Sequence, residues 1–331
     1  MKKISQKYFF NKKLLSNKSI LITGGTGSFG KAFIEYIIKK KIKFKKLVIL
    51  SRDELKQFNL QSSIPKNLIK KFRFFLGDIR DKERLVQAFE NIDYVIHAAA
   101  LKQVPTAEYN PSEFIKTNIL GTTNIVDACF KNNVKKAILL STDKASSPIN
   151  LYGATKLCAD KLFVSSNNIK GKRKIKLSVV RYGNVMGSRG SVIEIFNKQK
   201  KNNELTITDK NMTRFNIFLD NAVELVLWTL ENCKGGEIIV PKLKSFYVKD
   251  LARAYGKNIK IIETGIRPGE KLDEEMISIY DSANTTEFKD KFIIFNNIKN
   301  KSNLKFSYNS RDNKDFLSTE ELKKILKFFN K

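Results

Sequence analysis

A glycine-rich turn joins an apolar segment to an amphipathic one near the start of the chain. Residues 20–23 read Ile-Leu-Ile-Thr, and GGTGSFG follows directly at 24–30. Because Gly24, Gly27 and Gly30 lack a Cβ, the backbone there can turn tightly and approach a pyrophosphate closely. The helix that follows would present its N–H groups and positive dipole end to the phosphates. The context of strand, turn and helix therefore favours a dinucleotide site over a glycine turn without a ligand.

Short β-rich runs alternate with amphipathic stretches through the first half of the chain. Strands are predicted at residues 19–23, 47–50, 72–76, 94–97, 137–141 and 177–182. Helices are predicted at residues 31–40, 81–89, 117–132 and 153–166. This alternation is typical of a parallel sheet with helices on both faces. The sequence therefore predicts an α/β fold, with a Rossmann-type doubly wound parallel sheet over residues 1–183.

The alternation weakens after Gly183. Residues 194–201 and 222–232 have helical patterns, residues 237–240 have a strand pattern, and glycines at 235, 236 and 269 punctuate this half. We expect residues 184–331 to form mainly a smaller substrate-binding region. A return of the chain to the main sheet is compatible with the pattern.

The composition narrows the class of protein. The chain has 331 residues, 42% of them hydrophobic, which is enough for a sizeable core. It lacks the run of roughly 20 apolar residues that a membrane span needs. Residues 1–13 lack the apolar core of a signal peptide and are interpreted as a loose or docked extension. Three widely spaced cysteines suit neither a disulfide framework nor a zinc site, so a reducing cytoplasm is expected.

The net charge of +29 admits two interpretations. A strongly basic chain can bind nucleic acid. The lysines are spread along the sequence rather than gathered in one block, however, and Asn, Ile and Phe are abundant too. We therefore favour a solvated basic surface, whose field would also attract an anionic substrate such as a sugar diphosphate.

The ends of the second and third strands bear on the choice of cofactor. Ser51, Arg52 and Asp53 follow the second strand, about 20 residues past the glycines. An acidic residue directly at this strand end would favour NAD, whereas an arginine accommodates the extra phosphate of NADP. Because Ser51 and Arg52 come first, the sequence favours NADP, although Arg52 could instead cap a solvated loop. Asp78, after the third strand, could bond the adenine amino group.

Two pairs of residues near the fifth strand suggest the chemistry. Asp143 and Lys144 follow the strand end, and Tyr152 and Lys156 come soon afterwards as Tyr-x-x-x-Lys. Residues spaced i and i+4 share a helix face. An ammonium beside a phenol lowers its pKa, so Tyr152 could act as a base near neutral pH. The single histidine, His97, ends a buried-looking strand and is interpreted as a core residue.

These features resemble the extended short-chain dehydrogenase/reductase superfamily. More narrowly, the chain resembles the inverting UDP-N-acetylglucosamine 4,6-dehydratases that open the pseudaminic acid pathway. The motifs that carry this resemblance are ITGGTGSFGK, SRDELKQ, HAAALKQVP, AEYNP, STDKA, PINLYGATKL, VVRYGNV, GSRGSV, MTRF and IRPGEKL. They run from about residue 20 to residue 272.

The resemblance implies a division of catalytic roles. Tyr152, helped by Lys156, would deprotonate the sugar 4-hydroxyl while a hydride passes from carbon 4 to the nicotinamide. Lys144 would remove the proton of carbon 5, and Asp143 would assist the loss of water from carbon 6. The hydride then returns to carbon 6, and carbon 5 is reprotonated on the opposite face. Lys144 can act as a base only if its pKa is lowered, which a closed site beside a charged nicotinamide would do.

The resemblance also implies the binding residues and a homo-oligomer. The implied NADP-binding residues are Gly24, Thr26, Gly27, Ser28, Phe29, Gly30, Ser51, Arg52, Asp53, Lys56, Asp78, Ile79, Ala98, Ala99, Lys102, Thr117, Asn118, Tyr152, Lys156 and Val185. The implied residues for the UDP-sugar are Lys102, Asn184, Thr206, Arg214, Arg267 and Glu270. The chain departs from many relatives at Gln103 and Asp273, which affects details of sugar binding rather than the reaction class.

Three alternatives stay open from the sequence. A related dehydratase could serve another deoxy-sugar of the N-acetyl-L-fucosamine type, although some relatives in that branch lack the tyrosine that stands here at 152. A 4-epimerase would leave Asp143 and Lys144 without a purpose. A non-catalytic, basic Rossmann protein that binds nucleic acid or senses a cofactor would explain the charge but not Tyr152 and Lys156.

Overall fold

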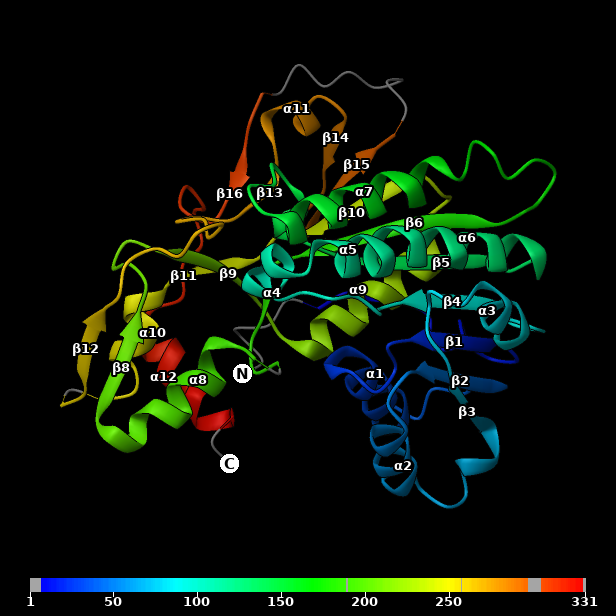
Figure 1. Ribbon diagram of the computed structural model, residues 1–331, viewed down its shortest axis with the longest axis horizontal. Helices are drawn as coiled ribbons and strands as arrows, with labels where there is room; N and C mark the ends of the chain where they lie inside the picture. The colour runs from blue at the N-terminus through cyan, green and yellow to red at the C-terminus, as the bar shows by residue number, and fades with distance from the viewer. Residues whose placement is uncertain (1–6, 189, 257, 297–304, 330–331) are drawn as a thin grey trace.

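A nine-stranded sheet forms the centre of the computed structural model, which describes residues 7–188, 190–256, 258–296 and 305–329. The strand order is β14-β15-β10-β6-β5-β4-β1-β2-β3 (Figure 1). Neighbouring strands from β10 to β3 run parallel, whereas β15 pairs antiparallel with β10 and with β14. The strands are β1 (Ser19–Thr23), β2 (Lys46–Ser51), β3 (Phe72–Leu76), β4 (Tyr94–His97), β5 (Lys136–Thr142), β6 (Lys176–Tyr182), β10 (Glu237–Pro241), β14 (Thr285–Glu287) and β15 (Lys291–Phe295).

This sheet confirms the predicted α/β class with a mostly parallel Rossmann-type sheet. The strands predicted at 19–23, 72–76 and 94–97 coincide with β1, β3 and β4, and the others differ by a residue or two at their ends. Three strands from the second half of the chain, β10, β14 and β15, belong to the same sheet.

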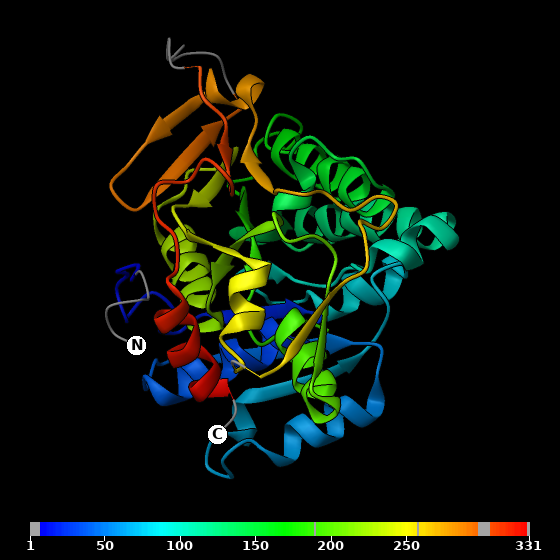
Figure 2. The ribbon, with the colours of Figure 1, turned by 90° about the vertical axis from the view of Figure 1, so that its left-hand side faces the viewer.

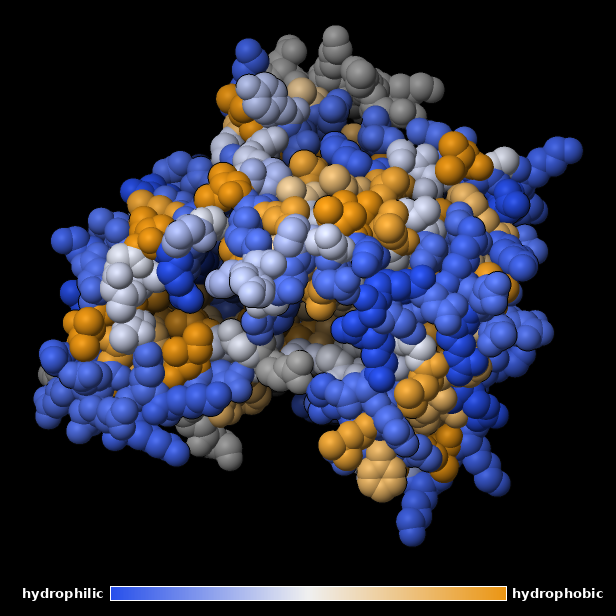
Figure 3. Space-filling model, viewed as in Figure 1, coloured by the Kyte–Doolittle hydropathy of each residue, from blue (hydrophilic) through white to orange (hydrophobic). Residues whose placement is uncertain are grey.

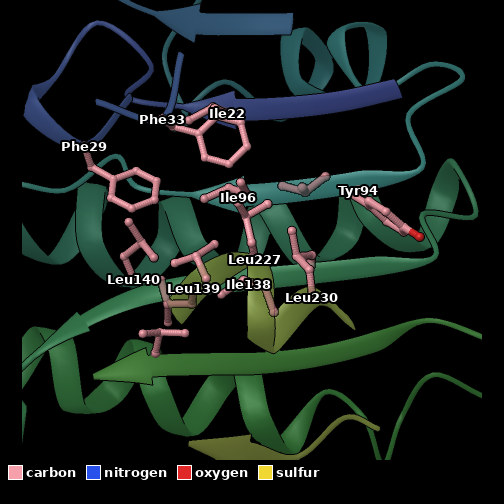
Figure 4. Close-up of a cluster of buried hydrophobic side chains, with 14 of the residues drawn as sticks. Ile22, Phe29, Phe33, Tyr94, Ile96, Ile138, Leu139, Leu140, Leu227 and Leu230 are labelled. Carbon is pink, nitrogen blue, oxygen red and sulfur yellow. The ribbon is translucent and has the colours of Figure 1, made fainter. Parts of the chain in front are cut away.

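Helices cover both faces of the sheet. α3 (Lys82–Ala88), α6 (Gly121–Lys131) and α7 (Leu151–Ser165) pack together on one face, and α1 (Ser28–Lys39) packs against α9 (Leu219–Asn232) on the other (Figures 1 and 2). Because both faces are covered, β1 and β4 are buried along their whole length and read as continuous apolar runs. In Figure 4, Leu227 and Leu230 of α9 lie close to Ile138 of β5, with Phe33 of α1 nearby.

A second lobe with its own apolar cluster lies beside the carboxyl ends of the parallel strands (Figure 1). It contains α8 (Val192–Gln199), α10 (Val248–Arg253), α12 (Thr319–Phe329) and the pair β8 (Glu204–Ile207) with β12 (Lys260–Glu263). α10 and α12 lie side by side, around the buried Leu251, Leu322 and Ile325 (Figure 2). Two small sheets link the parts: β7 (Asn184–Val185), β9 (Thr213–Ile217) and β11 (Lys244–Tyr247), and β13 (Glu275–Ile277) with β16 (Tyr308–Asn309).

The N-terminal extension is docked where the structure describes it. Residues 1–6 lie outside the described residues, but Tyr8 is buried and its N–H donates to Glu224 of α9 (3.4 Å). The N–H of Asn11 donates to Glu231 of the same helix (3.0 Å). None of the three cysteines, all of which are described, forms a disulfide. Among the described residues, no helix has the length and apolar character that crossing a membrane requires.

Candidate active site

The glycine turn lies where the carboxyl ends of β1 and β4 meet. Gly24 has φ +64°, and a Cβ there would lie 2.9 Å from both Cα and N of Ala99 in the loop after β4. A side chain at 24 would therefore collide with backbone. α1 begins at Ser28, and its first turn carries no acidic side chain. In Figure 3 the surface is hollowed between the second lobe, on the left, and the part that carries α1 and α2 (Glu54–Ser62). These features fit a dinucleotide phosphate group.

The residues after β2 and β3 form a charged rim beside this turn. Arg52 is exposed, and its Nη1 lies 3.5 Å from Asp78 Oδ2. Asp53 caps α2 by accepting the Lys56 N–H (2.9 Å), and it forms an ion pair with the Lys56 ammonium. Arg80 also binds Asp78 (2.7 Å). Burial raises the pKa of Asp78, but the hydrogen bonds and charge of Arg80 outweigh it and hold the pKa below its usual value. With Asp53 engaged as a cap, Arg52 is the exposed side chain at this strand end.

The other predicted cofactor residues occupy different depths. Asn118 lies in a π-helical turn (Ile115–Leu120), where its amide accepts from Leu101 N (2.9 Å) and donates to Leu101 O (2.9 Å) and Thr155 Oγ1 (3.0 Å). The hydroxyl of Thr117 is buried without a hydrogen-bond partner among the described residues. Thr26, Phe29 and Ile79 are buried, Ser28, Ala98 and Val185 are half-buried, and Lys102 is exposed. Asn118 thus ties the loop after β4 to α7.

Asp143 and Lys144 form a short turn (Asp143–Ala145) directly after β5. Lys144 Nζ lies 3.2 Å from Asp143 Oδ1 and 2.8 Å from Glu274 Oε1. Both carboxylates are 1% exposed, and one oxygen of each, Asp143 Oδ2 and Glu274 Oε2, has no hydrogen-bond partner in the described part of the chain. The result is a half-buried ammonium between two buried carboxylates, each of which has one oxygen without a hydrogen-bond partner among the described residues.

Gly153 allows this turn to approach Tyr152. A Cβ on Gly153 would lie 2.2 Å from the carbonyl oxygen of Lys144, so only glycine fits between the turn and α7. The hydroxyl of Thr142 donates to Asp143 Oδ1 (2.9 Å) and is hydrogen-bonded to the Tyr152 phenol. The structure therefore joins Tyr152, Asp143 and Lys144 in one cluster.

The geometry of Lys156 differs from the sequence expectation. Lys156 shares the helix with Tyr152 but donates its Nζ hydrogen to the carbonyl of Leu140 (2.8 Å). Burial raises the pKa of Tyr152 to about 12, and the charge that opposes this effect belongs to Lys144 rather than Lys156. The prediction that Lys156 brings the phenol toward neutral pH stays a prediction. In this structure Lys144 is the ammonium whose charge lowers the pKa of Tyr152.

The charge state of Lys144 depends on the two carboxylates beside it. Burial lowers its pKa, but the negative charges of Asp143 and Glu274 outweigh burial and raise the pKa above its usual value. The predicted lowering concerns the closed site beside a charged nicotinamide and stays a prediction. The pKa of Asp143 is raised, first by burial and further by Glu274, while Lys144 opposes the rise. The pKa values of both partners are thus shifted upward, and the charge of Glu274 contributes to both shifts.

The predicted sugar-binding residues are only partly brought together. Arg214 on β9 donates to the carbonyls of Thr213, Leu272 and Lys271 (2.7, 2.9 and 3.0 Å). Glu270 lies 3.5 Å from Arg214 Nη2 and 3.4 Å from Nε of the exposed Arg267. Arg214 therefore contacts the segment 267–275, which itself carries Arg267 and Glu270.

Two further predicted residues lie elsewhere. Asn184 is exposed at the start of β7. Thr206 lies on β8 in the second lobe, where its hydroxyl accepts from Gln199 Nε2 (2.7 Å). Among the described residues, no hydrogen bond or ion pair joins Thr206 to the cluster around Lys144. The assignments of Asn184, Thr206, Arg214, Arg267 and Glu270 to the UDP-sugar stay predictions.

Glu274 and Thr142 were missed by the sequence reasoning. Thr142 adjoins Asp143, so its place at the end of β5 was a usable signal. Glu274 follows Lys144 by 130 residues and stands among other acidic residues, so spacing could not single it out. His97 is confirmed as a core residue: its ring nitrogens bond Thr23 (2.7 Å) and Thr122 (3.2 Å), and burial lowers its pKa to about 3.

The fold and the site together define a Rossmann-fold enzyme that pairs a dinucleotide with a Tyr-x-x-x-Lys helix. The chain belongs to the polysaccharide biosynthesis protein family, whose model matches residues 20–296. It is 49% identical, over 95% of its length and 98% of the relative's, to the UDP-N-acetylglucosamine 4,6-dehydratase (inverting) of Campylobacter jejuni serotype O:23/36. It is also 42% identical to the UDP-glucose 4-epimerase of Rickettsia canadensis, over 84% of this chain and 83% of that protein.

Solved structures agree with the fold. The X-ray structure of Pen from Bacillus thuringiensis matches with a TM-score of 0.88 and 38% identity, over 96% of this chain and 100% of that one. DesIV, a dTDP-glucose 4,6-dehydratase from Streptomyces venezuelae with NAD bound, matches with a TM-score of 0.66 and 19% identity, over 77% of this chain and 86% of that one. The second likeness supports the fold alone.

Proposed function

We propose that this chain is an inverting UDP-N-acetylglucosamine 4,6-dehydratase. The observation that carries the proposal is the Lys144 ammonium between Asp143 and Glu274 (3.2 and 2.8 Å), in the same cluster as the Tyr152 phenol. Removal of water across carbons 5 and 6 needs a base for the carbon 5 proton and an acid for the carbon 6 hydroxyl. The cluster contains one candidate for each role. The near full-length similarity to the Campylobacter jejuni dehydratase supports the same reaction.

In the proposed mechanism, Tyr152, Lys144 and Asp143 each carry out one proton transfer. Tyr152 takes the proton of the 4-hydroxyl, and the positive charge of Lys144 favours the phenolate form. Lys144 as an amine takes the proton of carbon 5, which the 4-ketone has made acidic. Asp143, whose raised pKa favours the carboxylic acid, gives a proton to the departing carbon 6 hydroxyl. A new proton then reaches carbon 5 from the opposite face, which gives the L-arabino 4-keto-6-deoxy sugar nucleotide.

The cofactor we propose is NADP. Bound nicotinamide would accept the hydride from carbon 4 and return it to carbon 6, so that the net reaction is an elimination. Arg52 supports NADP over NAD, since it is exposed at the end of β2 while Asp53 is used as a helix cap. The diphosphate of the substrate suits Arg267, which is exposed beside Glu270. We also propose a cytoplasmic homo-oligomer, on the resemblance to extended short-chain dehydrogenases and the unpaired cysteines.

A UDP-sugar 4-epimerase is the second candidate, because the Rickettsia canadensis relative carries that name. Epimerisation at carbon 4 needs Tyr152 and a cofactor but no group that acts on carbons 5 and 6. The buried Asp143 carboxylate and its ion pair with Lys144 would then have no chemical use, although burying a charge is costly.

One NMR experiment separates the two candidates. Purified enzyme with NADP and UDP-N-acetylglucosamine should produce a new carbon 6 methyl signal and a ketone or its hydrate. A C4-epimer that retains its carbon 6 hydroxymethyl group would support the epimerase and overturn the dehydratase.

A further inference from the structure

Glu274 is a buried carboxylate that the predicted roles do not use. It directly precedes β13, is 1% exposed, and places Oε1 at 2.8 Å from Lys144 Nζ and 3.6 Å from Arg214 Nε. Its other oxygen, Oε2, is buried without a hydrogen-bond partner among the described residues. Asp143 already supplies one negative charge to Lys144, so the ion pair alone does not require a second buried carboxylate.

The backbone around Glu274 is fixed from two sides. On the side of α7, Asn150 Nδ2 donates to the Gly269 carbonyl (2.7 Å) and Lys271 Nζ donates to the Ser146 carbonyl (2.9 Å). On the side of β9, Arg214 holds two carbonyls of the same segment. The N–H of Glu274 itself donates to Ser310 Oγ (2.9 Å). These hydrogen bonds hold the backbone of the segment in place, so the position of the buried Glu274 carboxylate is pre-organised.

We propose that Glu274 is a positioning residue of the elimination step, which holds Lys144 against Asp143 and retains one transferable proton within that pair. This inference rests on the proposed dehydratase function. Glu274 acts through Lys144 rather than on the sugar.

The proton balance explains why a third charge is useful. Transfer of one proton from the Lys144 ammonium to the Asp143 carboxylate leaves an amine and a carboxylic acid. The amine takes the carbon 5 proton, and the acid gives its proton to the carbon 6 hydroxyl, which leaves as water. The pair ends as ammonium and carboxylate, as it began. The negative charge of Glu274 raises the proton affinity of both partners, so the shared proton is kept.

Several other charged or titratable groups face this pair. Arg214 lowers the pKa of Lys144 and of Glu274, and Lys271 lowers that of Glu274. Burial raises the pKa of Glu274, but the charges of Lys144 and Arg214 outweigh burial, so Glu274 stays ionised. Tyr152 contacts the pair through Thr142. Glu274 is thus the fixed charge, and Asp143 is the carboxylate that exchanges a proton.

The test compares Glu274→Gln with Glu275→Gln in the full chain. Glu275 is the adjacent carboxylate and accepts hydrogen bonds from Ser147 (2.6 Å) and Ser307 (2.7 Å), and in the described part of the chain it forms no ion pair with Lys144. Turnover of UDP-N-acetylglucosamine by the unaltered protein is measured first. If the unaltered protein forms no 4-keto-6-deoxy product, the proposed function fails, independently of Glu274.

Given an active unaltered protein, Glu274→Gln should lower kcat for elimination about 100-fold with little change in KM. Oxidation at carbon 4, followed as reduced cofactor in a single turnover, should persist. The limb of the pH profile that reports Lys144 deprotonation should move to lower pH by about one unit, since a negative charge beside the ammonium is lost. Glu274→Asp should restore the position of that limb, and Glu275→Gln should leave both rate and profile unchanged.

A second measurement does not depend on turnover. The side-chain NMR signal of Lys144, assigned by its absence in Lys144→Arg, should titrate at lower pH in Glu274→Gln than in the unaltered protein without substrate. Unchanged titration and unchanged kcat would overturn the proposal. Equal losses of carbon 4 oxidation and of elimination, with a lowered unfolding temperature, would also overturn it and make Glu274 a purely structural residue.

Discussion

The glycine turn at residues 24–30 and the segment 267–275 are built in different ways. The turn uses backbone: Gly24 lies against the backbone of Ala99, and a Cβ on Gly30 would lie 2.2 Å from the carbonyl oxygen of Gly25 within the turn itself. The segment 267–275 uses long side chains from distant parts of the chain, such as Lys144 on Glu274 and Arg214 on the Lys271 carbonyl. A phosphate site can thus be encoded locally, whereas the acid–base cluster depends on correct packing of the whole chain.

The largest effect is expected at Lys144, which pairs with Glu274 of the segment 267–275. Lys144→Ala should slow elimination by about 10⁴-fold, the upper range for a general base, because no other amine replaces it beside carbon 5. NADP binding, which depends on the glycine turn, should be nearly unchanged in a titration of the same variant.

Lys144→Arg is the matched control for this change. Arginine keeps a positive charge between Asp143 and Glu274 but is not deprotonated in proteins, so the variant should fold and still fail in elimination. Wild-type rates in either variant would remove Lys144 from the mechanism.

Tyr152→Phe should reduce turnover by about 10³-fold while cofactor binding persists, because the base for the 4-hydroxyl is lost. Here single-turnover formation of reduced cofactor is the measurement, since it reports carbon 4 oxidation directly. Tyr255→Phe is the control. That phenol donates to Ile193 O (3.1 Å) and lies near Asn197 Oδ1 (2.9 Å) in the second lobe, so its loss should affect stability but not chemistry. A variant at 152 that oxidised the sugar at the normal rate would exclude Tyr152 as the base.

Gly24→Ala probes the region built from backbone. The methyl group would meet Ala99 Cα at 2.9 Å in a left-handed conformation, so the free energy of unfolding should fall by about 3 kcal/mol. NADP affinity should fall with it. Gly236→Ala is the control, because Gly236 also has a positive φ (+96°) but has open space where the methyl group would be added. Urea unfolding should therefore show a smaller loss in the free energy of unfolding, about 1–2 kcal/mol. Equal losses would mean that conformation, and not the close approach to Ala99, requires the glycine.

The smallest effect is expected at the rim of the glycine turn. Arg52→Ala should weaken NADP about 10-fold and NAD hardly at all, because the lost contact is to the 2′-phosphate. Isothermal titration with both cofactors measures this. Arg73→Ala, which removes an equal charge from an exposed position on β3, controls for the general field. The same loss for both cofactors would argue against a 2′-phosphate contact.

The sequence predicted most of the sheet and much of the cluster, for a physical reason. Strands buried on both faces are continuous apolar runs, and several helices between them show amphipathic spacing, so the six strands and four helices predicted over residues 19–182 were found with small errors at the ends. The helices at Glu54–Ser62, Val104–Tyr109 and Pro111–Phe114 were not predicted. Asp143, Lys144 and Tyr152 lie within ten residues of one another, and a strand end fixes where they begin.

The rest depended on contacts that spacing does not encode. Glu274 and Lys144 meet only because β9, β13 and the turn after β5 pack together, and acidic residues are common enough that none stands out. The charge states of the chain without a cofactor depend on the same kind of contact. Burial and the second carboxylate decide the pKa of Lys144, and neither is visible in a motif.

The stereochemistry at carbon 5 distinguishes an inverting from a retaining dehydratase. The enzyme is incubated with NADP and UDP-N-acetylglucosamine in heavy water, and the early product is examined by NMR. The proposed mechanism predicts the L-arabino 4-keto-6-deoxy sugar nucleotide with deuterium at carbon 5. It also predicts that the hydride delivered to the carbon 6 methyl group comes from carbon 4 of the same substrate molecule. An early product that retains the D-xylo configuration would contradict the inverting assignment of Lys144 and Asp143.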